Sequence, residues 1–397
     1  MERSRVSERR GPKRFSECCE TRCLSKPSRS GSMGPKTKAK KERRCWTAGL
    51  GVWFTLSILA SIPAWAAMYV HRNWSDNSLF EMANHTHWHF ALGMLCVCLL
   101  DVILRWLNHW RAPWISRTLH AAILLIPTVY LCALAEPWTA LKLADWRTDK
   151  PTKPLSIASW NVFIQNHEFD TIEKTIESLD ADVVLLIEVT PEHRKGLMTL
   201  DKKYPYSKWS PRSNTQGLAI LSRIPGIKFQ ERITGPSQML SLEAVIPKGD
   251  YADEPIRLLG VHTASPNQNG RFRVRDEQLL EIAAWVQQSD LESIVIGDLN
   301  ITPWSDGFGR LIRQAGLIDT RRYRGFFATW PCGLGVVGIP IDHALVTPGL
   351  RVIDRESGFT NIDSDHQWIR MCVDGGTKAD RNRLDSRDDT GKSSRSP

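Results

Sequence analysis

The residues best suited to chemistry stand in Ile294–Asn300, where a short apolar run leads into a Gly-Asp-Leu-Asn turn. Asp298 and Asn300 are two positions apart, so an extended backbone places them on one side. A carboxylate beside a neutral amide can orient a water molecule and hold a phosphate oxygen without adding a second negative charge. The pattern is also typical of an ordinary turn, because Asp and Asn are common turn residues.

The same arrangement recurs along the chain, where polar residues follow short apolar runs that predict buried strands. The recurring elements are Trp160-Asn161, Leu185-Leu186-Ile187-Glu188, Val261-His262-Thr263, Ile341-Asp342-His343 and Ser364-Asp365-His366. Polar groups that are repeatedly delivered to strand ends indicate one convergent site. Taken singly, each of these residues also fits a turn cap, a surface ion pair or a structural histidine.

Six such elements in this order resemble the endonuclease/exonuclease/phosphatase superfamily, which includes DNase I-like nucleases, sphingomyelinases and inositol polyphosphate 5-phosphatases. The resemblance covers about residues 152–374. Ala328-Thr329-Trp330-Pro331 resembles a bacterial, membrane-anchored branch of that superfamily. The resemblance implies an α/β fold, a four-layer sandwich with two packed β-sheets flanked by helices, and the sequence predicts that three transmembrane helices precede it.

The resemblance also implies a metal centre. It makes Glu188 the principal ligand of Mg²⁺, with Mn²⁺ as an alternative ion, and it places Asn161 and Asp365 in or beside the metal sphere. Few protein ligands are needed, because Mg²⁺ keeps several of its waters. No cluster of cysteine and histidine has the spacing of a zinc site.

Five residues resemble the catalytic set of the superfamily. Asp298 orients or deprotonates the attacking water, and Asn300 bonds the nucleophile or a phosphate oxygen. His366 stabilises the charge that develops on the phosphate, and Asp342 pairs with it to fix its tautomer. His262 donates to a phosphate oxygen or to the leaving group. The expected function is metal-assisted hydrolysis of a phosphodiester or phosphomonoester.

Charge is concentrated at the start of the chain. The formal net charge is +9, but residues 1–46 hold 15 basic and 5 acidic residues, so the remainder carries −1. This tail fits a disordered cytoplasmic segment that orients a membrane protein, although a basic arm could also bind nucleic acid. Met33 is an alternative start of the chain.

Three apolar runs follow the tail, at about 48–70, 90–107 and 119–135. Ten of the 16 tryptophans lie between residues 46 and 146, as an interfacial aromatic belt requires. The second run carries Asp101 and Arg105, which either snorkel to the interface or mark a transport or sensor site. A cleavable signal peptide does not explain three runs.

The distribution of Lys and Arg predicts the orientation of these runs. Basic segments before the first run and between the second and third place the catalytic domain outside the cytoplasm, on a multi-pass bacterial inner-membrane protein. If the second run failed to cross, the domain would face the cytosol and a nuclease role would be favoured. The predicted organisation is a basic tail (1–46), a three-span region (47–137), a linker (138–153), the catalytic domain (154–374) and a disordered tail (375–397).

The substrate class stays open among nucleic acid, phospholipid and phosphorylated small molecules, with the lipid bilayer as a second partner and no obligate protein partner evident. Phe163 stands where abasic-site endonucleases carry an aspartate, which argues against repair of duplex DNA. The rival interpretation is a non-catalytic binding or scaffold module on the same fold. Arginines near residues 271–275 and 321–324 could hold phosphate, and Cys332 and Cys372 could form a bridge.

Overall fold

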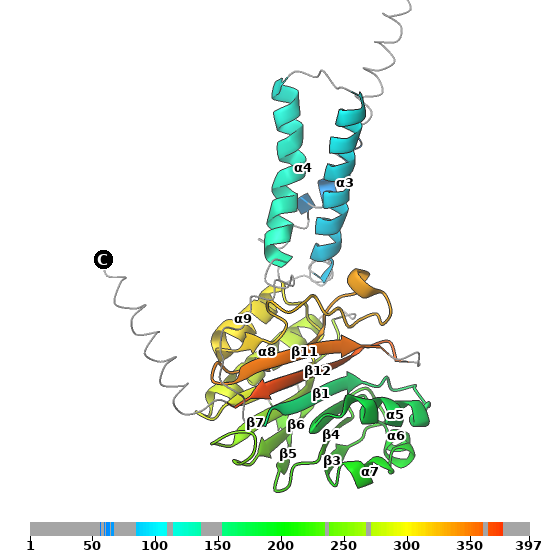
Figure 1. Ribbon diagram of the computed structural model, residues 1–397, viewed down its shortest axis with the longest axis vertical. Helices are drawn as coiled ribbons and strands as arrows, with labels where there is room; N and C mark the ends of the chain where they lie inside the picture. Colours follow the sequence, from blue (N-terminus) through cyan, green and yellow to red (C-terminus); the bar gives the residue numbers. More distant parts are fainter. Residues whose placement is uncertain are drawn as a thin grey trace, which may run out of the picture. The chain divides into compact units, whose positions relative to one another are not determined.

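A computed structural model gives the structure of the chain (Figure 1). It describes residues 56, 59, 61–63, 65–66, 85–108, 114–135, 153–234, 238–266, 271–359 and 364–375. The helices named in the figure are α3 (His87–Asn108), α4 (Trp114–Ala135), α5 (Phe169–Leu179), α6 (Pro191–Gly196), α7 (Leu200–Lys203), α8 (Arg271–Gln287) and α9 (Asp306–Ala315). The predicted tails and most of the predicted linker lie outside the described residues.

The strands of the described residues form two six-stranded sheets. The first, in spatial order, contains β11 (Arg351–Gly358), β12 (Trp368–Asp374), β1 (Leu155–Asn161), β2 (Val183–Ile187), β4 (Leu218–Ser222) and β3 (Tyr206–Ser210). The second contains β5 (Lys228–Thr234), β6 (Met239–Ile246), β7 (Ile256–His262), β8 (Ser293–Asp298), β10 (Asp342–Val346) and β9 (Ile318–Asp319). Both sheets are mixed, because β1 pairs with β2 and β7 with β8 in parallel while the other pairs are antiparallel.

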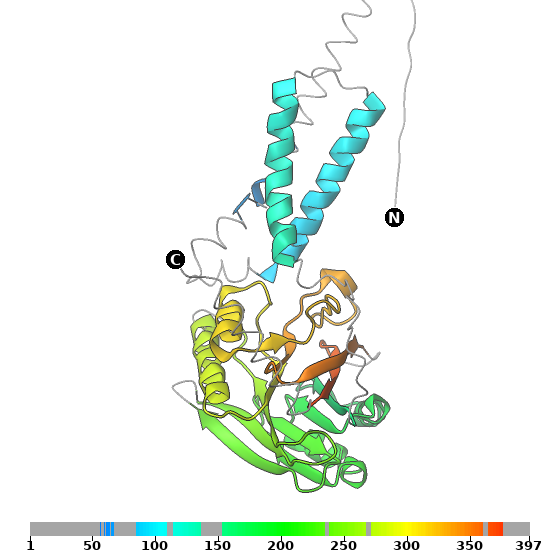
Figure 2. The ribbon, with the colours of Figure 1, turned by 60° about the vertical axis from the view of Figure 1, so that its left-hand side comes forward.

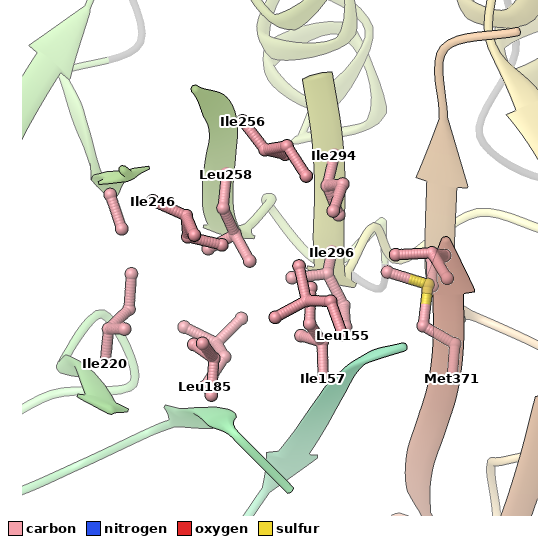
Figure 3. Packing of buried hydrophobic residues seen from close by; sticks show 14 of the residues in the cluster. Leu155, Ile157, Leu185, Ile220, Ile246, Ile256, Leu258, Ile294, Ile296 and Met371 are labelled. Atoms are coloured by element: carbon pink, nitrogen blue, oxygen red, sulfur yellow. The ribbon is translucent and has the colours of Figure 1, made fainter. Parts of the chain in front are cut away.

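The two sheets pack face to face, because side chains alternate along each strand. On β2, Leu185 belongs to the central core, whereas Leu186 belongs to the core beneath the helices. On β8, Ile294 and Ile296 likewise enter the central core while Val295 faces the other way. Figure 3 shows side chains of the two sheets pointing toward one another across this central layer.

Helices cover the outer faces of both sheets, so the predicted four-layer arrangement is confirmed. Ile172 and Ile176 of α5 pack on the outer face of the first sheet. Leu279 of α8 and Phe308 of α9 pack on the outer face of the second. Figure 2 shows α8 and α9, coloured yellow-green and yellow, on one side of the sheets and the green helices on the other.

The second and third apolar runs form α3 and α4, whereas the first run lies mostly outside the described residues. In the ranges that the structure describes, no helix is both long enough and apolar enough to cross a bilayer. The prediction of three transmembrane helices is therefore not confirmed. Asp101 and Arg105 in α3, and His120 in α4, interrupt the apolar sequence.

The bridge that the sequence left open is absent. Cys332 and Cys372 are both free thiols, and so are Cys96 and Cys98 among the described cysteines. Cys372 lies on β12, where it pairs with Ser156 of β1 in the strand ladder. Among the described residues, the two sheets are therefore joined by packing rather than by a covalent link.

Candidate active site

Three strands of the second sheet bring three polar residues to one edge. The parallel pairing of β7 and β8 sets His262 beside Asp298, and the antiparallel pairing of β8 and β10 sets Asp342 beside Asp298. Gly297 makes this register possible, because its φ is 142° and a Cβ there would come within 2.0 Å of the Val261 carbonyl oxygen.

Asp298 lies at the centre of the site. Its Oδ2 is 3.6 Å from Nε2 of His262 and 3.8 Å from Nε2 of His366. The amide nitrogen of Asn161 donates to the same oxygen at 3.5 Å. The backbone N–H of Asn300 donates to Oδ1 at 2.8 Å. Burial, reinforced by the nearby charge of Asp342, raises the pKa of Asp298 to about 6.

His366 and Asp342 form a buried pair in which Nδ1 lies 2.9 Å from Oδ2. Burial opposes the charge on His366, but the Asp342 and Asp298 carboxylates outweigh it and raise the pKa of His366 to about 10. Burial likewise opposes the charge of Asp342, and the partner imidazole nevertheless holds the pKa of that carboxyl below its usual range. The hydroxyl of Thr329 accepts the backbone N–H of Asp342 at 3.2 Å and helps to hold the strand end.

His262 is oriented by a backbone carbonyl. Its Nδ1 lies 2.9 Å from the carbonyl oxygen of Thr215, which can only accept, so Nδ1 carries the proton. The other nitrogen, Nε2, therefore faces Asp298. The sequence did not reveal Thr215 as a site residue, because a carbonyl contribution carries no side-chain pattern.

Glu188 is held by the first sheet. Its Oε1 accepts from the amide nitrogen of Asn161 at 3.1 Å, and its Oε2 accepts from the backbone N–H of Ile164 at 3.0 Å. The amide oxygen of Asn161 in turn accepts the N–H of Phe163 at 3.1 Å. Glu188 and Phe163 have φ values of 63° and 66°, a left-handed conformation that non-glycine residues seldom adopt.

A cavity of about 340 Å³ opens between these residues. Seven of the predicted or supporting polar residues line it: Glu188, Thr215, His262, Asp298, Asn300, Asp365 and His366. Asp342 and Asn161 reach it through the hydrogen bonds just described. The structure therefore gathers all eight predicted residues around one cavity, drawn from both sheets.

The donors that face the cavity fit a hard cation. Glu188, Asp298 and Asp365 supply carboxylate oxygens. Asn300 donates its amide nitrogen to the Thr263 carbonyl at 2.9 Å, which leaves its amide oxygen for the cavity. Mg²⁺ and Mn²⁺ take oxygen ligands of this kind. Asn161 presents its amide nitrogen to the carboxylates of Glu188 and Asp298 and so positions them.

Within the described residues, Asp298, Asp342 and His366 also place their ligand atoms within 4.8 Å of one another. An ion there would compete with the bond between Asp342 and His366. A protonated imidazole is not a metal ligand, and the raised pKa of His366 favours that form. The trio therefore suits acid–base chemistry better, whereas the outer carboxylates Glu188 and Asp365 suit the metal.

Two tryptophans support the site in ways that the sequence did not reveal. Trp330 donates its indole N–H to Oδ2 of Asp365 at 2.9 Å. Trp160 donates its indole N–H to the carbonyl oxygen of His366 at 3.2 Å. Ser364 anchors the same turn by donating to the Asn161 carbonyl at 2.7 Å. Their positions beside the predicted residues were the one available signal.

Several polar residues near the motifs are structural. His343 is fully buried and donates through Nε2 to the carbonyl oxygen of Ile301 at 2.7 Å, so it faces away from the cavity. Arg275 binds Asp276 at 2.7 Å, and Arg321 binds Asp319 at 2.6 Å, both guanidinium groups being buried. Of the two arginine clusters, Arg271 alone lines the cavity.

Comparison with known proteins agrees with this geometry. Residues 158–366 match the model of the Endonuclease/Exonuclease/phosphatase family, and the chain belongs to that family. The name of the family covers enzymes that hydrolyse phosphate esters. No curated protein sequence matches the chain.

Solved structures resemble the chain at low identity. An endonuclease/exonuclease/phosphatase from Beutenbergia cavernae is 17% identical, with a TM-score of 0.45, over 56% of this chain and 72% of that one. TDP2 from D. rerio, complexed with a single-strand DNA product, is 18% identical, with a TM-score of 0.44, over 56% and 99%. The catalytic domain of human Nocturnin with bound sulfate is 16% identical, with a TM-score of 0.43, over 55% and 94%.

Proposed function

We propose that this chain is a divalent-metal-dependent phosphoesterase that cleaves a phosphodiester or phosphomonoester by attack of water. The observation that carries the proposal is the position of Asp298, which lies within 4 Å of two imidazoles and an amide on the wall of one cavity. A buried carboxylate in this setting is suited to accept a proton from water. The competing interpretation, a non-catalytic module, gives no reason for such convergence.

Glu188 and Asp365 are the residues that would hold Mg²⁺ or Mn²⁺, with Asn161 keeping Glu188 in place. The ion would supply Lewis-acid stabilisation of the negative charge on the phosphate. Trp330 keeps Asp365 directed toward the cavity through its indole bond. Both carboxylates are thus oriented by hydrogen bonds before any ion arrives, which reduces the reorganisation that binding requires.

Each remaining residue has a separate role in the proposed reaction. Asp298 accepts the proton of the attacking water. Asn300 accepts from that water through its amide oxygen, or donates to a phosphate oxygen through the second N–H of its amide. His366, held as a cation by Asp342, donates from Nε2 to the phosphate as charge develops. His262, in the imidazolium form that keeps Nδ1–H on the Thr215 carbonyl, donates from Nε2 to a phosphate oxygen or to the leaving alcohol.

The test uses full-length protein purified in detergent. It should hydrolyse bis(p-nitrophenyl) phosphate with Mg²⁺ or Mn²⁺, lose activity with EDTA and recover it when metal is returned. Asp298→Asn should lower kcat at least about 100-fold. Absence of activity on this diester, nucleic acids, phospholipids and phosphorylated small molecules, in either metal, would leave the binding-module interpretation in its place.

Membrane anchoring with the catalytic domain outside the cytoplasm is part of the same proposal. The basic tail and the apolar runs support it, as do large apolar side chains that α3 and α4 leave exposed, such as Leu99 (56%), Val102 (62%) and Val129 (56%). Alkaline phosphatase, active only outside, should be active when fused after residue 150. An inactive fusion together with an active cytosolic reporter would place the domain inside and favour a nuclease.

A further inference from the structure

A second, smaller cavity lies directly beside the active site. Its volume is about 40 Å³, and Met239, His262 and Thr263 line both it and the larger cavity. Its walls are otherwise mainly apolar and come from β6, β7 and α8; they include Leu240, Leu259, Val261, Ile282 and Trp285. The two cavities therefore adjoin each other at these three side chains.

Two residues that line this pocket each carry a buried polar atom with no hydrogen-bond partner among the described residues, namely Oγ1 of Thr263 and Nε2 of Gln278. The two residues are only 3% and 4% exposed. The amide oxygen of Gln278, Oε1, has a partner, because it accepts the backbone N–H of Ala264 at 2.8 Å. That bond fixes the orientation of the amide and leaves its N–H donors for the pocket. Buried donors without partners are costly, so they indicate a ligand that bonds to them.

The chemistry of the walls restricts what that ligand can be. Arg232 lines the pocket, but its guanidinium is already paired with the Glu243 carboxylate. The Glu281 side chain also lines the pocket, so its carboxylate would repel a second phosphate or another anion. An uncharged hydroxyl meets both requirements, because its oxygen can accept from Gln278 while its proton goes to Thr263 or Glu281.

The size of the pocket sets a second limit. A single water needs roughly 10–15 Å³ of such space. The pocket, at about 40 Å³, therefore accommodates a few non-hydrogen atoms, such as a hydroxymethyl group. The pocket thus suits the end of a short polyol.

We propose that this pocket is a specificity subsite for a hydroxyl group on one of the alcohols esterified to the phosphate. The inference rests on the proposed phosphoesterase function and narrows its substrates to esters of polyol alcohols. A site built to bond a hydroxyl discriminates strongly against an analogue that lacks it, because the buried donors are then left unpaired. Thr263 and Gln278 would be the residues that discriminate.

The test compares two diesters, methyl glyceryl phosphate and methyl propyl phosphate, which differ only in hydroxyl groups. Hydrolysis by full-length protein is followed by phosphorus NMR, and the measured quantity is the ratio of the two kcat/KM values. We expect the wild type to prefer the glyceryl ester at least tenfold. Thr263→Val, which removes only the hydroxyl, should lower that ratio about tenfold, whereas the matched variant Thr263→Ser should retain it.

Gln278→Met is a second variant should Thr263→Val not fold, and it too should lower the ratio about tenfold. Equal rates for the two esters in the wild type would overturn the proposal. Equal losses on both esters in the variants would also overturn it, since they would indicate a purely structural role. If the wild type cleaves bis(p-nitrophenyl) phosphate but neither of these two esters, the subsite proposal alone is overturned. If it cleaves none of the substrates of the first test either, the phosphoesterase proposal itself fails, which is a distinct result.

Discussion

His366 and Asp342 are hydrogen-bonded across the two sheets, with Nδ1 of the imidazole 2.9 Å from Oδ2 of the carboxylate. Asp342 begins β10 in the second sheet, and His366 precedes β12 in the first. The bond determines which imidazole nitrogen faces the cavity, because Nδ1 is engaged and Nε2 is left toward Asp298. A charged imidazole is thereby held where the phosphate would develop charge.

Asp342→Asn should therefore disable the site with little change in the fold. The amide cannot stabilise an imidazolium as a carboxylate does, so kcat should fall at least about 100-fold. The pKa of His366, about 10 in the wild type, should fall. Both are measurable, by steady-state kinetics and by NMR titration of the histidine ring. A variant with kcat within twofold of the wild type would contradict the role assigned to this pair.

Glu188→Gln should separate metal binding from folding. The neutral amide keeps the shape of the side chain but loses the charge that attracts the cation, so Mg²⁺ affinity should fall about 100-fold or more in calorimetry. Glu356→Gln is the matched control, because the Glu356 side chain is 47% exposed and its one ion pair within the described part of the chain is with Arg370. The control should bind Mg²⁺ as the wild type does. Equal Mg²⁺ affinity in the wild type and both variants would show that Glu188 does not bind the ion.

Gly297→Ala should destabilise the domain by more than the backbone strain of a positive φ alone would cause. Gly249 has a similar φ, 151°, but a Cβ there meets nothing within 4 Å, whereas at Gly297 it would meet the Val261 carbonyl oxygen. We expect Gly249→Ala to cost about 1–3 kcal/mol in the free energy of unfolding and Gly297→Ala more than about 4 kcal/mol. Urea denaturation measures both. Equal costs would show that β7 and β8 can separate to accept a methyl group.

His193 should make stability depend on pH. Burial lowers the pKa of His193 from 6.5 to about 4, so the unfolded chain binds a proton more readily than the folded one. Its contribution to stability is therefore complete above about pH 6.5 and is lost as the pH falls toward 4. His193→Gln should flatten the curve of Tm against pH in that window. Parallel curves for the variant and the wild type would exclude this role.

The central strands and the convergent residues were predictable because both carry side-chain patterns. Continuous apolar runs such as those of β2 and β8 are typical of strands buried on both faces. The edge strands β3 and β5 were missed. Each pairs with one neighbour only, and Lys208 of β3 forms an exposed ion pair with Glu231 of β5. Alternating charged residues at a sheet edge resemble loop sequence.

The supporting contacts could not be predicted for a different reason. The carbonyl of Thr215, the indole of Trp330 and the amide of Gln278 act through loop geometry and tertiary packing. None of these leaves a periodic signal in the sequence. The helical segments α3 and α4 show the reverse case, because apolar composition predicted helices correctly but did not establish that they cross a membrane.

The pairing of β1 with β12 sets the time at which this protein can first act. Leu155 lies opposite Val373 in that ladder, so the first strand of the domain, which already pairs with β2, gains its second partner only when the last strand has been made. Asp365 and His366 arrive with that last strand. A chain still being synthesised thus carries Asn161 and Glu188 long before their counterparts exist. The proposed hydrolysis should therefore begin only after synthesis has passed residue 366, and a chain that ends before Ser364 should lack it altogether.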